Sequence, residues 1–325
     1  MLIRIAALVA AGVGLVVSAP AVAQRAATVP RIGVLWQTAP PPPVHPHLPL
    51  MLKGLKDLGW EEGKTVAVEH RYGGNDSARL AALAAELVRE KVDVITTAGD
   101  LSTRAAQQAT NRIPIVALVG FPVESGFAKS LSRPGGNVTG FAVIADDLAV
   151  KRLELLKDLV PRVSRVAVLW DPVTHDRQPN AVKAAAGNLG LKVEVFSAKS
   201  AGELEGAFEA AAAARSEALL VLISPMFLGN RSTLVRLASQ YRMPAIYHHP
   251  TFTDAGGLIS YGPSLDEQWR LIAGAIDKIL RGALAAELPF QQPTRFELEV
   301  NLKAAREIGI EVPQSILLRA SRVIE

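Results

Sequence analysis

The chain of 325 residues contains no cysteine. This absence excludes disulfide bonds, thiol nucleophiles and thiolate-bound metals, so the fold has to be stabilised by burial of apolar side chains. It also excludes a lipid-modified cysteine next to an export signal. If the protein is exported, we therefore expect its mature form to be soluble rather than lipid-anchored.

Aromatic residues and clustered charges are also scarce. Aromatic side chains make up 5% of the chain, so each aromatic residue near a predicted ligand site carries more weight than usual. The 35 basic and 31 acidic residues give a net charge of +4, and no run of five basic residues occurs. This pattern is typical of an ordinary solvated surface, and we expect no nucleic-acid partner.

Long apolar runs are confined to the N-terminus. Arg4 precedes an apolar stretch over residues 5–17, and a small-x-small cleavage pattern ends at Ala23. These three parts predict a secretory signal peptide over residues 1–23, cleaved after Ala23. A membrane anchor is the alternative, but the stretch is short and is followed by Pro20. We expect a soluble protein of the periplasm.

The motifs of common enzyme classes are missing as well. Beyond the signal peptide there is no glycine-rich dinucleotide loop, no Walker A loop and no Gly-x-Ser-x-Gly nucleophile elbow. His248 and His249 are adjacent, so in an extended chain they point to opposite faces and do not make a metal site. His45 and His47 lie in a proline-rich loop. We expect no catalytic residue, no metal and no cofactor.

What the sequence does contain is an internal repeat. The segment RIGVLW at residues 31–36 returns as RVAVLW at residues 165–170. Three further pairs follow in the same order: 65–69 with 192–196, 92–97 with 218–223, and 112–116 with 242–246. RIGVLW and RVAVLW are both apolar runs of the kind that forms a strand buried on both faces. The repeat predicts two similar lobes with a ligand cleft between them.

The strands of each repeat alternate with helical segments. Helices are predicted at about 48–58, 77–90 and 102–110 in the first unit, and at 178–189, 203–214 and 230–240 in the second. Strict alternation of strands and helices predicts parallel sheets covered on both faces. The predicted fold class is therefore α/β, with two similar, doubly wound parallel-sheet lobes.

Ligands of open α/β sheets bind beyond the carboxyl ends of the strands, so residues just after each strand are the candidates for the site. Thr139 and Tyr261 join them because they lie at predicted crossings between the lobes. The candidate ligand-binding residues are Trp36, Asp100, Leu101, Ser102, Phe121, Pro122, Thr139, Trp170, Asp171, Ser224, Phe227, Tyr247 and Tyr261. Aromatic side chains with a few polar anchors are typical of a small-molecule pocket.

Individual roles follow from residue type. Trp36 and Trp170 end the two repeated strands, and we expect them to face each other across the cleft. Ser102 at a helix start is expected to hold a ligand carboxylate, and Asp171 or Asp100 an amine. Each also fits a structural role, Ser102 as a helix cap and Asp171 as a turn former. The second lobe is where we expect an acid to meet a polar end of the ligand.

Several separated motifs resemble one known family. They lie at residues 54–64, 83–95, 134–140, 151–156, 256–264 and 288–298. Together they resemble the ABC transporter substrate-binding protein family that includes tryptophan-binding-type periplasmic proteins, over essentially all of residues 31–325. Relatives often have a small residue and proline in place of Asp100 and Leu101, and Asn-Pro-Asn in place of residues 171–173. The extra acid in each lobe leaves the charge of the ligand open.

The resemblance implies a type I periplasmic binding fold whose lobes are joined by a three-crossing hinge. It implies lobe one at residues 30–142 and 251–292, and lobe two at residues 143–250 and 293–325. It also implies a monomer that captures a small organic solute with an aromatic or apolar body and a carboxylate, such as an aromatic amino acid or an aromatic acid. The solute would pass to a permease and its ATPase. A ligand sensor that presents its closed form to a receptor is an alternative, and an exported α/β enzyme is a weaker one.

Overall fold

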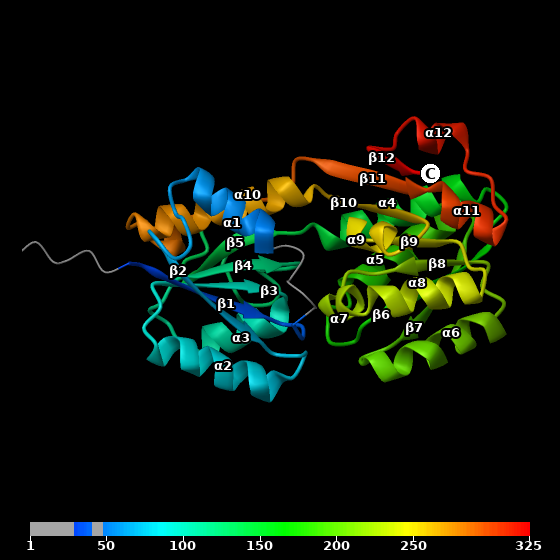
Figure 1. Ribbon diagram of the computed structural model, residues 1–325. Coiled ribbons are helices and arrows are strands. Elements are labelled where there is room, and N and C mark those ends of the chain that lie inside the picture. The colour runs from blue at the N-terminus through cyan, green and yellow to red at the C-terminus, as the bar shows by residue number, and fades with distance from the viewer. Residues whose placement is uncertain (1–28, 41–47) are drawn as a thin grey trace, which may run out of the picture.

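The computed structural model describes residues 29–40 and 48–325. The predicted signal peptide, His45 and His47 lie outside the described residues. Within them, the chain forms two α/β lobes that lie side by side (Figure 1). No helix in these two ranges is long and apolar enough to cross a membrane. The prediction of two α/β lobes is confirmed.

The first lobe is built on a five-stranded parallel sheet in the order β2-β1-β3-β4-β5. Its strands are β1 (Arg31–Trp36), β2 (Ala67–Tyr72), β3 (Val94–Ala98), β4 (Ile115–Val119) and β5 (Val138–Ala142). Helices α2 (Ser77–Arg89) and α3 (Asp100–Ala109) cover one face, and α1 (Leu48–Asp57) and α10 (Leu265–Leu280) cover the other. Ile32, Val34 and Trp36 pack on the α1/α10 side, while Leu35 packs on the α2/α3 side. This alternation is why the strand is apolar throughout.

The second lobe is built on a seven-stranded sheet in the order β12-β11-β10-β9-β8-β6-β7. Its strands are β6 (Arg165–Trp170), β7 (Lys192–Ser197), β8 (Ala218–Val221), β9 (Ala245–Tyr247), β10 (Ile259–Pro263), β11 (Phe296–Asn301) and β12 (Arg322–Ile324). Its helices are α4 (Ala145–Leu159), α5 (Arg177–Ala186), α6 (Leu204–Ala213), α7 (Pro225–Gly229), α8 (Arg231–Gln240), α9 (Pro250–Asp254), α11 (Leu302–Ile308) and α12 (Gln314–Leu317). The sheet is mostly parallel, but β11 runs antiparallel to β10, a departure from the predicted all-parallel sheet.

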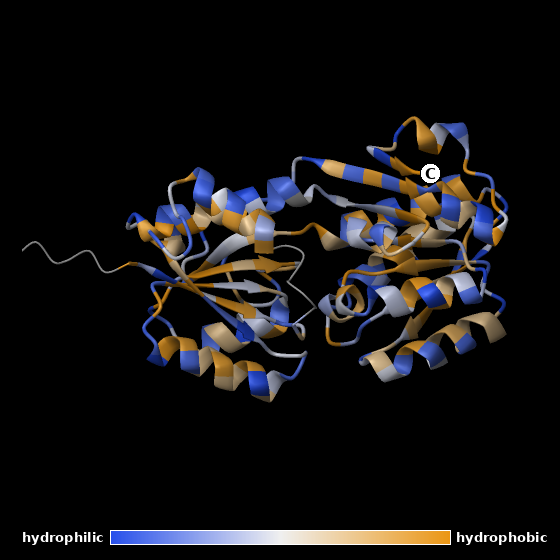
Figure 2. Ribbon diagram, in the orientation of Figure 1, coloured by the Kyte–Doolittle hydropathy of each residue, from blue (hydrophilic) through white to orange (hydrophobic). Residues whose placement is uncertain are grey.

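The sequence repeat corresponds to a repeat in space. The strand order β2-β1-β3-β4 of the first sheet is matched by β7-β6-β8-β9 in the second. In each lobe, the copy of the repeated apolar segment lies one strand in from an edge of its sheet and pairs with a strand on each side. Figure 2 shows apolar strands in the middle of both lobes and polar residues on the outer faces of the helices.

The chain passes between the two sheets three times. It crosses from β5 to α4, returns from β10 to α10, and crosses again before β11. The second pass lies later than the predicted boundary. Residues 251–263 were expected in the first lobe, but β10 pairs with β9 and β11, and Leu258 and Ile259 pack in the core of the second lobe. The assignment of this segment was therefore wrong.

Candidate ligand-binding cleft

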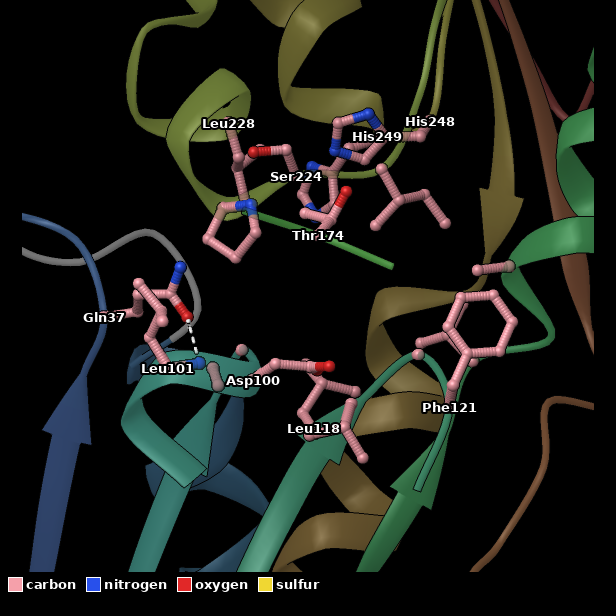
Figure 3. Close-up of a pocket in the computed structure, with 18 of the residues that line it drawn as sticks. Gln37, Asp100, Leu101, Leu118, Phe121, Thr174, Ser224, Leu228, His248 and His249 are labelled. Atoms are coloured by element: carbon pink, nitrogen blue, oxygen red, sulfur yellow. Dashed lines mark hydrogen bonds between the residues drawn. The ribbon is translucent and has the colours of Figure 1, made fainter. Parts of the chain in front are cut away.

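A cavity with a volume of about 160 Å³ lies between the lobes. The first lobe supplies residues that follow β1, β3 and β4, together with Gln268 and Trp269 of α10. The second lobe supplies residues that follow β6, β8 and β9. In Figure 3 the two sets face each other across an open space, with Gln37, Asp100, Leu101, Leu118 and Phe121 opposite Thr174, Ser224, Leu228, His248 and His249. The carboxyl ends of the strands therefore meet at one cleft, the edge at which the sequence placed the ligand.

The two lobes touch around this cavity. A Cβ built on Gly99 of the first lobe would lie 3.0 Å from the Pro225 ring of the second, and one built on Gly229 would lie 3.6 Å from Thr38 Cγ2. Arg177 of α5 also pairs with Glu124, which lies in the loop after β4. The lobes are therefore in contact beside the cavity, an arrangement termed the closed form.

The start of α3 forms the floor of the cavity on the first-lobe side. The helix begins at Asp100, two residues earlier than predicted, and Gly99 is its N-cap with φ +108°. The Leu101 N–H donates to Gln37 Oε1 at 3.1 Å, so this helix-start donor already has a partner. A Cβ on Gly99 would lie 2.2 Å from the same Gln37 oxygen, so the residue has to be glycine. Ser102 is fully buried and donates to the Gly99 carbonyl at 3.0 Å, which leaves it outside the cavity lining.

Asp100 lines the cavity and is partly buried. Its Oδ2 accepts a hydrogen bond from Ser125 Oγ at 2.9 Å. Burial raises the pKa of the Asp100 carboxyl, and the Ser125 hydroxyl and the charge of Arg104 oppose this rise without cancelling it. Desolvation therefore exceeds the stabilisation of the anion by its present neighbours.

Asp171, the acid expected in the second lobe, does not reach the cavity. It is 2% exposed, accepts from Ser224 Oγ at 2.6 Å through Oδ2, and accepts from the Val173 N–H at 3.0 Å through Oδ1. Burial raises the pKa of its carboxyl. Ser224 does line the cavity, and its oxygen accepts from the Met226 N–H at the start of α7. Asp171 therefore positions Ser224, and in this structure the acid beside the cavity is in the first lobe.

The two repeated tryptophans do not face each other. Trp36 lines the cavity and stacks on His70 and Tyr72, with ring centroids 6.4 and 6.3 Å apart. Trp170 is partly buried and packs against the second-lobe core that α4 and α5 share, on the same side of its sheet as Val166 and Val168. The expected facing of the two rings is wrong because the Trp170 side chain packs into this core and does not line the cavity.

The other predicted residues that line the cavity are Leu101 and Phe121. The remaining candidates have structural partners instead. Thr139 donates to the Leu288 carbonyl at 2.6 Å, and Tyr247 stacks on Phe252 with ring centroids 4.6 Å apart. Phe227 is fully buried in the second-lobe core, Pro122 is buried in the loop after β4, and Tyr261 stacks on Phe296. None of these five lines the cavity.

Several lining residues were not predicted. Gln37 directly follows Trp36, and Thr174 follows the Asp171-Pro172 turn, so extending the strand-end rule by a few residues would have found them. His248 and His249 directly follow β9, where the strand-end rule places the site, and both line the cavity although neither was among the candidate ligand-binding residues. Trp269 lies on α10, and no local pattern shows that this helix returns to the first lobe. Its side chain packs against Trp36 with ring centroids 6.0 Å apart.

The comparisons with known proteins agree with this geometry. The family model for ABC transporter substrate binding proteins matches residues 49–324. The chain belongs to this family. The type I periplasmic binding fold expected from the sequence is confirmed by the similarity to solved structures that include a leucine binding protein of Thermotoga maritima.

Individual relatives give the range of similarity. A tyrosine-binding protein of Clostridioides difficile is 25% identical over 264 residues, which cover 80% of this chain and 75% of the relative. The ABC domain of a Streptococcus pneumoniae protein in complex with L-Trp has a TM-score of 0.81 at 25% identity, and covers 91% of this chain and 100% of its own. A conserved domain protein of Vibrio cholerae O1 biovar El Tor has a TM-score of 0.83, with the same identity and coverage.

Proposed function

We propose that this protein is the solute-binding component of an ABC uptake transporter and binds a small organic solute with an aromatic or apolar body. The observation that carries the proposal is the cavity that both lobes close, lined mainly by apolar and aromatic side chains with a few polar groups. Such a lining is typical of small-molecule sites. The similarity to a tyrosine-binding protein and to a domain that holds L-Trp supports an aromatic amino acid as the ligand.

The size of the cavity suits a body of about one or two aromatic rings. Its volume of about 160 Å³ is close to that of a cavity of about 150 Å³ that holds benzene. Trp36 and Trp269 form one aromatic wall, and Phe121 lies at the cavity edge on the same lobe. An aromatic solute between these side chains would bury apolar area and gain ring–ring contacts.

The proposed mechanism is closure of the lobes about the three crossings. A solute that contacts both lobes binds the closed form more tightly than the open form, so it shifts the population toward closure. The closed form would then dock on a membrane permease, whose ATPase drives release of the solute. We place the protein in the periplasm as a monomer, in keeping with the predicted signal peptide.

A ligand screen tests this function. Thermal unfolding of the purified protein is measured with aromatic amino acids, aromatic acids and branched-chain amino acids, and mass spectrometry identifies any solute released from the protein on denaturation. A bound ligand at about 100 times its Kd is expected to stabilise the fold by about 2.7 kcal/mol. Absence of stabilisation by every organic solute, together with no solute released, would refute the proposed function.

A further inference from the structure

The permanent charge on the cavity wall is of one sign, negative. Asp100 is the single acid among the described residues that line the cavity, and no lysine or arginine lines it within the same residues. Figure 3 shows the Asp100 side chain extending from the start of α3 into the space below Thr174. The wall therefore presents one carboxylate and no permanent cation.

Nearby basic groups of the first lobe do not neutralise this carboxylate. Arg104 lies one turn further along α3, but its Nη2 donates to the Ser125 carbonyl at 3.0 Å and its guanidinium lies over Phe127, 5.1 Å from the ring centre. Asp100 makes no ion pair within 4 Å to any described residue. Its hydrogen-bonding neighbours, the Ser125 hydroxyl and the Gly120 backbone, carry no charge and so do not balance a carboxylate.

The second lobe does not supply the missing cation either. His248 is buried, and burial together with the charge of Arg152 holds the pKa of its imidazole well below its usual value, so it is neutral. The charge of a protonated His175 lowers the pKa of the Asp100 carboxyl, but the two side chains make no ion pair among the described residues. The His175 ring packs on Phe121, with centroids 5.4 Å apart, and its Nδ1 lies 3.2 Å from Asp176 Oδ1. A carboxylate left without a counter-ion in a partly dry site is costly, and a cationic ligand group would offset that cost.

We propose that the ligand carries a cationic amine, which binds beside Asp100, and that Asp100 is the residue that selects for it. This inference rests on the proposed function and narrows the ligand to aromatic amino acids or aromatic amines. An aromatic acid without an amine is expected to bind weakly, because its negative charge would meet the Asp100 carboxylate with no lysine or arginine among the described lining residues to balance it. The amine is the required group, and a carboxylate is optional.

Matched ligands test the inference by isothermal titration. One series is tryptophan, tryptamine, which lacks the carboxylate, and indole-3-propionate, which lacks the amine; the other is tyrosine, tyramine and 3-(4-hydroxyphenyl)propionate. In the wild-type protein the amine-bearing members of the series that binds are expected to bind roughly 10- to 100-fold more tightly than the deaminated acid, as is typical of hydrogen bonds to charged groups. In the isosteric variant Asp100→Asn this ratio is expected to fall toward one.

Asp171→Asn is the matched control. Asp171 is also a buried acid that accepts from a serine hydroxyl, but it lies outside the cavity lining. Its variant is expected to keep the ratio between amine-bearing and deaminated ligands, even if Ser224 shifts and all affinities fall. Circular dichroism checks that both variants fold.

Two results would overturn the inference and leave the proposed function intact. One is equal or tighter binding of the deaminated acids, and the other is an unchanged ratio in Asp100→Asn. If neither series binds, the solute released from the purified protein decides: a cationic amine in that solute supports the inference, and its absence overturns it.

Discussion

Arg177 connects the two lobes at the mouth of the cleft, and replacing it with glutamine tests how much closure contributes to binding. From the start of α5 in the second lobe, it donates to Glu124 of the first lobe, and its guanidinium carbon lies 5.1 Å from the centre of the Phe121 ring. It also donates to Asp146 of its own lobe, at 3.1 Å through Nε and 2.6 Å through Nη2. Only the Glu124 and Phe121 contacts are lost when the lobes separate.

The expected magnitude follows from these two contacts. The side chains of Arg177 and Glu124 are 42% and 39% exposed, so solvent screens their ion pair to about 0.2–1 kcal/mol. An exposed cation–π contact adds about 0.5–1 kcal/mol. Together they stabilise the closed form by about 0.7–2 kcal/mol, a factor of about 3 to 30 in an equilibrium constant. Because ligand binding is coupled to closure, the Kd of Arg177→Gln is expected to rise by up to this factor, mainly through faster dissociation.

The assay is isothermal titration and stopped-flow dissociation with one ligand, at low salt and at about 1 M salt, where charges on the surface are screened. Arg319→Gln is the matched control. Arg319 pairs with Asp158 at 3.1 Å, their side chains are 43% and 50% exposed, and both residues lie in the second lobe. High salt should weaken ligand binding by the wild type and by the control more than by Arg177→Gln. Equal Kd values for the two variants, or fully additive effects of Glu124→Gln and Arg177→Gln, would refute the reasoning.

Three further predictions follow from the cavity. Burial raises the pKa of Asp100 above its ordinary value of 3.8, so the carboxylate is protonated as pH falls through the raised pKa. Binding titrations at a series of acidic pH values should show the affinity for an amine ligand falling through this range. Asp100→Asn should remove this dependence of affinity on pH. By the same linkage, the free energy of unfolding of the ligand-free protein falls as pH rises through the raised pKa of Asp100. Without ligand at neutral pH, Asp100→Asn should therefore unfold at a higher temperature than the wild type. A lower unfolding temperature for the variant would contradict this. Gly99→Ala should cost about 1–3 kcal/mol in urea unfolding, because φ is +108° and the new Cβ would meet Gln37; an unchanged midpoint would show that the loop accommodates it. Trp36→Ala should weaken ligand binding strongly, because Trp36 lines the cavity. Trp170→Ala should mainly lower the free energy of unfolding, by at most about 3–5 kcal/mol, because Trp170 is a partly buried core residue. Equal losses of ligand affinity in the two variants would contradict the placement of Trp170 outside the cavity.

The edge of the sheet at which the cavity lies was predictable, but its exact lining was not. Trp36, Leu101 and Phe121 follow strands and do line the cavity, because parallel strands bring their carboxyl ends together. Trp170 and Asp171 follow a strand by the same rule and lie outside it. The rule selects a position along the chain, whereas the direction of a side chain depends on the helix or loop that packs beside it.

The assignment of segments to the two lobes shows the same limit of prediction from sequence. The motif at residues 256–264 contains the strand β10 (Ile259–Pro263). Its lobe depended on pairing with β9 and β11, which lie well apart from each other in the sequence. No local pattern distinguishes a strand that adds to one sheet from a strand that adds to the other.

The sequence by itself determined the types of element, the duplication and the absence of thiol chemistry, because these depend on composition and on short-range periodicity. It also showed that RIGVLW and RVAVLW form equivalent buried strands. Only the tertiary structure decided that Trp36 reaches the cleft while Trp170 packs into the second-lobe core, and that Asp100 rather than Asp171 is the acid beside the cavity. Contacts between elements far apart in the chain set these outcomes, since two identical strand ends with different neighbours bury different surfaces.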